Sequence, residues 1–311
     1  MKGFTKVSLI ICGILVAVGL LFVAIGAGFG FGTRQFVQMV RNRNWNWNWW
    51  SGRNTAESSE YDWVSDSEKW DANEVRNLDV EFDFGKLEFG YTDSDQLEVG
   101  VDYRNTWGSY HRNIIWNLDG DTLEIEDSVG NGILHLFSYG SGDAILYILI
   151  PKDKKFDEIK LDIGAAEVFI NAQLNAGDMK FTLGAGNVKC NTDLSAALSA
   201  EKLILDIGAG EMNLNGIQAD YMDVDCGTGA MSLWNVAARD MDVDCGVGSI
   251  SIEMVGTAED YDYKIDCGIG EVRVGDSSFS GLGQSRKIRN GTDRLVNIDC
   301  GVGEVEISFQ K

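Results

Sequence analysis

The stretch "MDVDCGTGAMSL" at residues 222–233 returns nineteen residues later as "MDVDCGVGSISI" at residues 241–252. Aligning the chain on the first glycine of this stretch finds five more matching blocks, and consecutive glycines are 20, 24, 19, 19, 22 and 33 residues apart. The seven aligned glycines are Gly164, Gly184, Gly208, Gly227, Gly246, Gly268 and Gly301. A period near twenty, with length changes between the matched blocks, is typical of a stacked repeat architecture.

Apolar and polar residues alternate within each block. Val224 and Cys226 share one face and Asp225 the other, while Met231 and Leu233 share a face after the glycines. Period two on both sides of a glycine corner predicts two short strands joined by a bend. We therefore expect an all-β fold, a parallel β-solenoid whose coils bond to one another at about 4.8 Å. The corner glycines would supply backbone angles that side chains forbid.

This register places four cysteines in an inward position. They occupy the slot that Ile163, Leu183 and Ile207 fill in other blocks, and they are Cys226, Cys245, Cys267 and Cys300. Free cysteine behaves as a small buried hydrophobe, so we expect a column of core thiols. Disulfides between adjacent coils are an alternative. A zinc site has less support, because the chain has no C-x-x-C pair and only two histidines.

The same register places a column of aspartates outward, beside the corners: Asp162, Asp206, Asp225, Asp244, Asp266 and Asp299. Their carboxylates could accept hydrogen bonds from turn N–H groups. A ladder that collects cations is the alternative. The calcium β-roll consensus is not matched, because here the aspartate precedes the glycines. We expect no metal site, no cofactor and no catalytic residues.

The amino-terminal part of the chain has a different composition. After a short tail, residues 1–6, residues 7–32 carry no charge and would make a helix of about 39 Å at about 1.5 Å per residue. We predict one transmembrane helix there. Residues 33–70 hold six tryptophans, five of them between Trp45 and Trp63, and read as a tether with an interfacial belt, or as an aromatic strip that binds sugars or peptides. Lysines and arginines on both sides of the span leave its orientation open.

The rest of the chain divides into two parts. Residues 71–150 read as a divergent β cap, with a first coil at residues 78–91, and residues 151–311 as regular solenoid repeats. Residues 275–295 are the one sizeable insertion between blocks. They carry the candidate partner-contact residues Arg286, Lys287, Arg289 and Arg294 on an otherwise acidic domain. The plain alternative is a solvated β-hairpin.

The charge balance restricts the function. The 311 residues include 26 basic and 48 acidic residues, for a formal net charge of -22. That argues against nucleic acid as a partner, because phosphates are neutralised mainly by lysine and arginine. With 37 glycines, one proline and no constellation for nucleophilic catalysis, we expect no enzyme. The alternatives are a polysaccharide-acting β-helix enzyme, with carboxylates on adjacent coils as acid and base, and a calcium-dependent structural module.

The lead-in "ILIPKDKKFDEIKLDIGAAEV" (148–168), the registered blocks after it and the closing "NIDCGVGEVEISF" resemble a bacterial family. It is the membrane-anchored β-strand-repeat family called "putative adhesins" (DUF4097-like), related to the toastrack domains of envelope-stress proteins. The resemblance covers roughly residues 75–310. It implies a right-handed solenoid outside the cell membrane, with a role in adhesion, interaction or envelope sensing. The partner would be an unidentified protein or cell-wall component, and glycines spaced as GxxxG in the predicted span give weak support to a homo-oligomer.

Overall fold

The computed structural model describes residues 62–105, 112–129, 144–191 and 196–310. The tail, the predicted transmembrane helix and the tether up to residue 61 lie outside the described residues. Within the described part, the chain forms no helix long and apolar enough to cross a membrane. The chain separates into two compact units, residues 1–59 and 60–311, and the fold below is that of the second.

Most described residues are in strands. In chain order these are β1 (Asp62–Asp71), β2 (Asn77–Thr92), β3 (Gln96–Asn105), β4 (Arg112–Asp119), β5 (Thr122–Val129), β6 (Ile145–Pro151), β7 (Phe156–Ile170), β8 (Leu174–Cys190), β9 (Leu198–Cys226), β10 (Ala230–Cys245), β11 (Ser249–Met254), β12 (Asp262–Val274), β13 (Ser277–Ile288) and β14 (Leu295–Phe309). One 3-10 turn, η2 (Ala258–Asp260), lies between β11 and β12.

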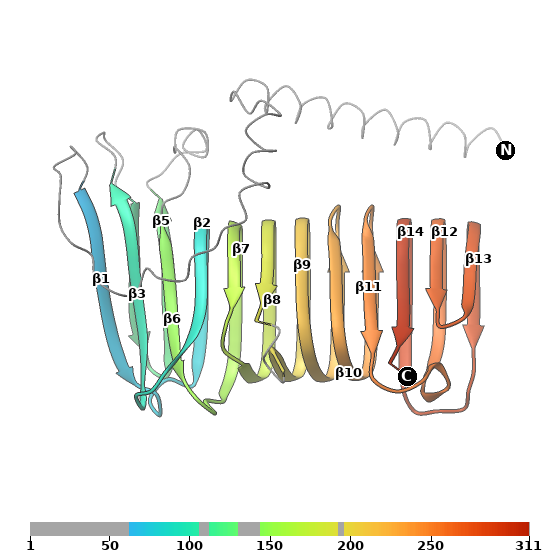
Figure 1. The fold of residues 1–311 in the computed structure, drawn as a ribbon, viewed down its shortest axis with the longest axis horizontal. Coiled ribbons are helices and arrows are strands. Elements are labelled where there is room, and N and C mark those ends of the chain that lie inside the picture. The colour runs from blue at the N-terminus through green and yellow to red at the C-terminus, as the bar shows by residue number, and fades with distance from the viewer. Residues whose placement is uncertain (1–61, 106–111, 130–143, 192–195, 311) are drawn as a thin grey trace, which may run out of the picture. The chain divides into compact units, whose positions relative to one another are not determined.

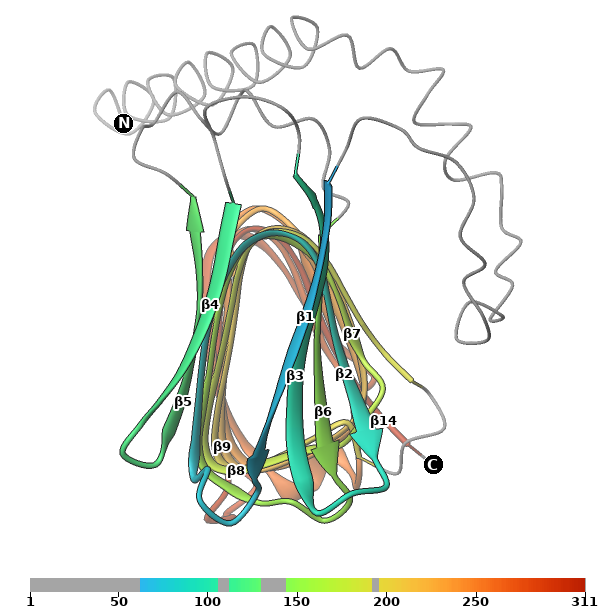
Figure 2. The same ribbon diagram turned by 90° about the vertical axis from the view of Figure 1, so that its left-hand side faces the viewer.

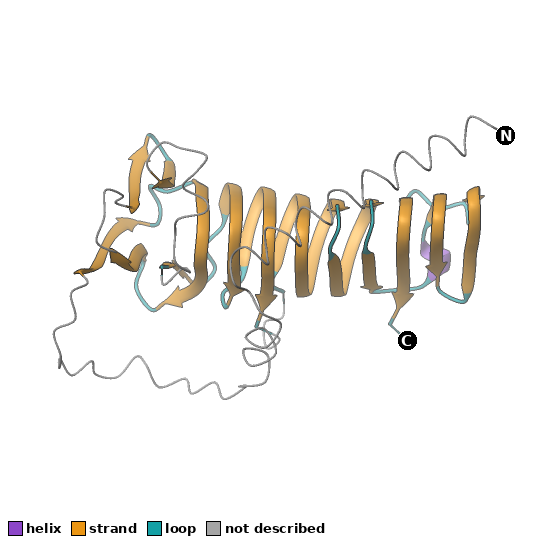
Figure 3. Cartoon of the chain, turned by 90° about the horizontal axis from the view of Figure 1, so that it is seen from above, coloured by secondary structure: helices purple, strands orange, loops and turns teal. Residues whose placement is uncertain are grey.

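These strands form one 14-stranded sheet with the order β1-β3-β6-β2-β7-β8-β9-β10-β11-β14-β12-β13, to which β4 and β5 add beside β2. From β2 and β7 through to β12 and β14, neighbouring coils pair in parallel. Figures 1 and 3 show them as a row of rungs, and Figure 2 shows the coils superposed around one interior. The predicted all-β stack of parallel coils is confirmed.

Each coil has two strand segments that meet at a glycine corner. We call face A the outward side of the segments before the corner, such as residues 158–163 in β7, and face B that of the segments after it, such as residues 165–170. In both segments every second side chain points inward and is buried, as Leu161, Ile163 and Val168 are. The two-residue period therefore drives the winding: the chain must turn once per coil to keep both apolar faces inside.

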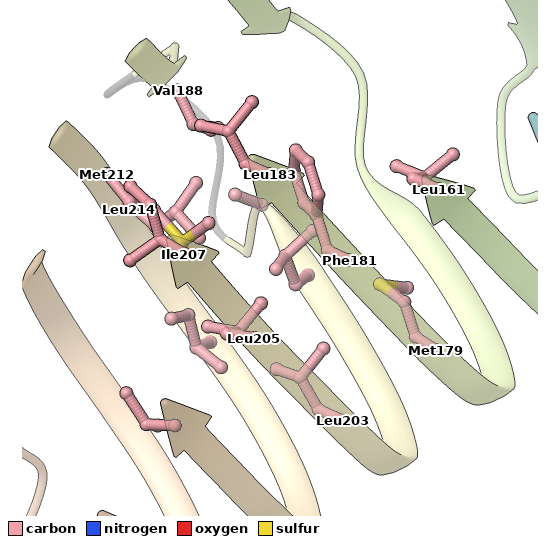
Figure 4. Close-up of a cluster of buried hydrophobic side chains, with 14 of the residues drawn as sticks. Leu161, Met179, Phe181, Leu183, Val188, Leu203, Leu205, Ile207, Met212 and Leu214 are labelled. Carbon is pink, nitrogen blue, oxygen red and sulfur yellow. The ribbon is translucent and has the colours of Figure 1, made fainter. Parts of the chain in front are cut away.

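The core is a set of apolar columns that run along the stack. Leu161, Phe181 and Leu205 are register partners on three successive coils, and all three side chains are fully buried. Figure 4 shows these side chains pointing into the shared interior with those of their neighbours. Burying one such side chain stabilises the fold by about 1.5–3 kcal/mol, which explains why every coil keeps the same inward positions apolar.

The corner glycines are needed for a different reason from the predicted one. None of the seven aligned glycines has a positive φ. A Cβ on Gly208 would lie 2.7 Å from the carbonyl oxygen of Gly184, so close approach of the coils excludes a side chain. Backbone angles that favour glycine occur two residues later, at Gly186 (φ 130°) and Gly210 (φ 135°). There a Cβ on Gly210 would lie 2.0 Å from the oxygen of Gly186.

The carboxy-terminal coils are not stacked in sequence order. β14 pairs in parallel with β10 and β11 on one side and with β12 on the other. β13 then pairs antiparallel with β12 along its whole length and is the last strand of the sheet. The insertion at residues 275–295 is therefore part of a β-hairpin, the alternative given above. Its strand β13 closes the stack (Figure 1).

At the other end, β2 is a complete first coil, since it pairs with β7 on both sides of Gly85. β5 pairs with the first segment of β2, and β4 pairs with β5. β6 pairs with the second segment of β2, β3 pairs with β6, and β1 pairs with β3. The indole N–H of Trp116, in β4, donates to Glu68 Oε2 in β1 at 2.9 Å. Trp116 and Trp70 also pack on the core. Aromatic side chains therefore cover this end of the apolar interior.

Candidate interaction surfaces

Face A carries the aspartate column that the sequence predicts. Strand register aligns Asp225 with Asp244, Asp244 with Asp299 and Asp299 with Asp266. Asp206 precedes Asp225, because the N–H of Gly227 donates to the oxygen of Ile207 at 2.8 Å. Toward β7 the column continues through Thr182, the register partner of both Asp206 and Asp162. We call this column the aspartate ladder.

A second acidic row runs beside the ladder, two residues earlier in each coil. It aligns Asp223 with Asp242, Asp242 with Asn297 and Asn297 with Lys264. Asp242 accepts hydrogen bonds from the Tyr221 hydroxyl at 2.6 Å and from Asn297 Nδ2 at 2.5 Å. Sequence analysis missed this row, although the doubled aspartate of "MDVDC" marks it in two blocks.

The two rows border a groove of about 300 Å³ on face A. Carboxylates dominate its lining, together with one lysine, one asparagine and two aliphatic residues: Asp223, Asp242, Val243, Asp244, Lys264, Asp266, Asn297, Ile298 and Asp299. Its walls hold no histidine, serine or cysteine. The groove therefore presents a negative surface.

The middle and the end of the ladder differ electrostatically. Burial, followed by the charges of neighbouring aspartates, raises the pKa of Asp206, Asp223 and Asp244 above the usual value. At the end near β13 the opposite holds. A hydrogen bond from Ser285 and the charges of Lys264 and Lys287 hold the pKa of Asp266 below its usual value. The direction of the pKa shift is therefore reversed beside β13.

The cysteine column is present inside the stack. Cys226, Cys245, Cys300 and Cys267 follow one another in register, in that spatial order, and all four side chains are buried. The five cysteines of the described residues are free thiols, so the disulfide alternative is not realised among them. Burial and the neighbouring thiols raise the pKa of Cys300 to about 12. These thiols act as core residues.

The four candidate contact residues all lie exposed at the β13 end. Arg286 and Lys287 are in β13, and Arg289 and Arg294 are in the segment that leads to β14. That segment is held in place by Asp262, whose Oδ1 accepts the N–H groups of Asn290 at 2.7 Å and Gly291 at 2.9 Å. The Arg294 guanidinium lies 5.7 Å from the centre of the buried Tyr261 ring.

No group of three or more histidine, cysteine, aspartate or glutamate side chains in the described residues is arranged to hold a metal ion. The polar surface instead has two regions of opposite charge: the acidic rows on face A and the basic residues of the β13 end.

A known family model, described as toastrack DUF4097, matches residues 75–281. This chain belongs to the toastrack DUF4097 family. The match begins at Val75, just before β2, and ends within β13. The family resemblance drawn from the sequence is confirmed.

Solved structures similar to this toastrack chain include a putative adhesin from Bacteroides fragilis, with 15% identity over 78% of this chain and 97% of that one and a TM-score of 0.47. A putative adhesin from Parabacteroides merdae has 14% identity over 78% and 95%, with a TM-score of 0.42. A putative cell adhesion protein from Clostridium sporogenes has 14% identity over 80% and 100%, with a TM-score of 0.33. A comparison with curated proteins found no match.

Proposed function

We propose that this protein is a non-enzymatic adhesion or interaction domain that presents the aspartate ladder to a partner carrying basic groups. One observation carries the proposal: carboxylates in the middle of the ladder oppose folding, yet the fold does not need them. Thr182 occupies the same outward position on its coil, so a neutral side chain is compatible with the winding. Raised carboxyl pKa values in the middle of the ladder show that the native state disfavours these charges.

The groove supports binding rather than catalysis. It is a polar surface along regular strands, lined mainly by carboxylates and one lysine, without histidine, serine or cysteine. A strongly negative surface speeds the encounter with positively charged partners and disfavours anionic ones. A basic protein segment or a cell-wall component with amino groups fits this surface.

Residues 7–32 would anchor the domain in the cell membrane as a single span, with the solenoid outside. Protease added to intact cells is then expected to digest residues 75–311. Complete protection of that region would contradict the topology. The right-handed sense of winding and a role in envelope sensing stay predictions.

Cross-linking in intact cells, followed by mass spectrometry, tests the contact surface. The full-length chain should capture a partner, and the double variant Asp225→Asn/Asp244→Asn should lose most of it, because the substitutions remove charge and keep shape. The matched control is Glu167→Gln/Asp220→Asn, two exposed acids outside both rows. Equal capture by the wild type and the ladder variant would show that face A is not the contact surface.

A further inference from the structure

In the described part of the chain, three strands at the ends of the stack have one free edge each: β1 and β4 at one end, where β4 pairs only with β5, and β13 at the other. Among the described residues, β1 pairs only with β3 and β13 pairs only with β12. The outer edge of each strand thus presents backbone N–H and C=O groups without a strand partner. Such an edge is a template for pairing with another chain unless charges, proline or a cover block it.

The free edges of β1 and β13 carry opposite charge. β13 contains Arg286 and Lys287 and no acidic residue. The described side chains of β1 include the exposed acids Asp66, Glu68 and Asp71, while its single lysine, Lys69, pairs with Glu98 at 3.1 Å. Like-charged edges repel, so two β13 edges or two β1 edges disfavour one another, whereas a β13 edge and a β1 edge attract.

Part of this charge lies on the inward side of the terminal strands. Asp66 and Glu68 are register partners of the buried Val101 and Val99, so they are on the side of β1 that faces the interior. Arg286 is the register partner of the buried Ile265 and is placed likewise at the other end. Charge of one sign therefore lies at each end of the apolar interior, beside the aromatic and aliphatic side chains that cover it.

We propose that this chain associates end to end with further copies of itself, the β13 edge of one copy pairing with the β1 edge of the next. Pairing would continue the sheet across the junction through main-chain hydrogen bonds, the mode known as β-augmentation. Because the contact joins two different surfaces, it can repeat and give open chains of copies. This self-association goes beyond the proposed function and does not depend on the partner of face A.

Charge reversal at either end provides the test, with the purified full-length chain in detergent micelles and sedimentation velocity as the measurement. Wild type should form larger species as its concentration rises. Arg286→Glu/Lys287→Glu and Asp66→Lys/Asp71→Lys should each weaken association about 100-fold or more, because like charges then face one another. Glu68 is kept, since it accepts the Trp116 hydrogen bond.

Mixing the two variants restores one acidic edge against one basic edge at every junction. The mixture should associate again, and so should a single chain that carries all four substitutions. Lys152→Glu/Lys155→Glu, exposed in the turn before β7, is the matched control and should behave as wild type. A wild type that stays monomeric, single-end variants that associate as wild type does, or a mixture that stays monomeric would each overturn the proposal.

Discussion

The middle coils and the carboxy-terminal coils use the same sequence block but are ordered differently. From β7 to β10, coils that touch are also consecutive in the chain. At the carboxy-terminal end, β14 lies between β11 and β12, although it comes last in the sequence. Register is kept in both regions, since Cys300 aligns with Cys245 and with Cys267. The block therefore specifies how two coils meet, but not which two.

Specific polar contacts mark the altered order at the carboxy-terminal end. The N–H of Leu295 donates to Asp240 Oδ1 at 2.9 Å as β14 enters beside β10. On the other side, Arg273 of β12 reaches Glu304 of β14 at 2.9 Å. These side chains lie outside the shared apolar pattern and select among coils whose cores are interchangeable.

The largest expected effect comes from the corners of the middle coils. Gly210→Ala should lower the free energy of unfolding by about 2–6 kcal/mol, because it combines an unfavourable positive φ with a clash against the Gly186 oxygen. Gly270→Ala meets a carbonyl equally close but has no positive φ, so its effect should be smaller. Urea denaturation measures both. Equal effects would show that φ is not the distinguishing factor.

The buried side of β14 should be nearly as sensitive as the middle coils. Ile307 is fully buried, and Ile307→Ala should cost about 2–5 kcal/mol of unfolding free energy. The matched control is Val302→Ala at the corner of the same strand, where the side chain is 46% exposed and the effect should be within about 0.5 kcal/mol. A mild effect of Ile307→Ala would mean that β14 is not an interior coil.

Replacing a cysteine of the buried column by serine should cost more stability than the same change at the half-buried Cys190. Cys300→Ser places a hydroxyl in an apolar column and should cost about 1–3 kcal/mol. At Cys190 the sulfur already accepts the N–H of Asn215 at 3.0 Å, and a serine oxygen could take over that role. Cys190→Ser should therefore be nearly neutral. Thermal unfolding of the two variants compares the sites.

The smallest effects are expected from the two acidic rows of face A and the neighbouring Asp262. Their contributions to stability have opposite signs in the middle of the stack and at its β13 end. A raised folded-state pKa means that stability increases as pH falls toward the ordinary aspartate pKa near 3.9, and Asp206, Asp223 and Asp244 contribute in this direction. Asp262 and Asp266 have lowered pKa values, so their contribution is lost as pH falls further. The melting temperature should pass through a maximum on the acidic side of neutral.

Two matched substitutions resolve these opposing contributions at pH 7. Asp244→Asn should raise the free energy of unfolding by less than about 1 kcal/mol, since solvent screens this largely exposed carboxylate. Asp266→Asn should lower the free energy of unfolding, because it removes the negative charge that strengthens the Ser285 hydrogen bond and pairs with Lys264. The same sign at both positions would contradict the contrast between the middle and the end of the ladder.

The repeat period and the alternation predict the coils, their inward thiols and their outward carboxylates, because both patterns are local. The order of the last coils could not be predicted, since "KIDCGIGEVRV" and "NIDCGVGEVEI" present almost the same apolar set. The role of the corner glycines was misjudged because close approach depends on the neighbouring coil, as at Gly208. The second acidic row was readable from Asp223 and Asp242 but was not recognised.

Native-state hydrogen exchange of β13 and β14 tests the interleaved order most directly. Backbone amide hydrogens of interior strands exchange only when the surrounding fold opens, whereas those at the free edge of a terminal strand exchange readily. In the Arg286→Glu/Lys287→Glu variant, whose β13 edge does not pair with other copies, slow exchange along β14 (Leu295–Phe309) and faster exchange along β13 (Ser277–Ile288) is the expected result. Fast exchange along β14, as for a strand at the end of the stack, would contradict its position between β11 and β12.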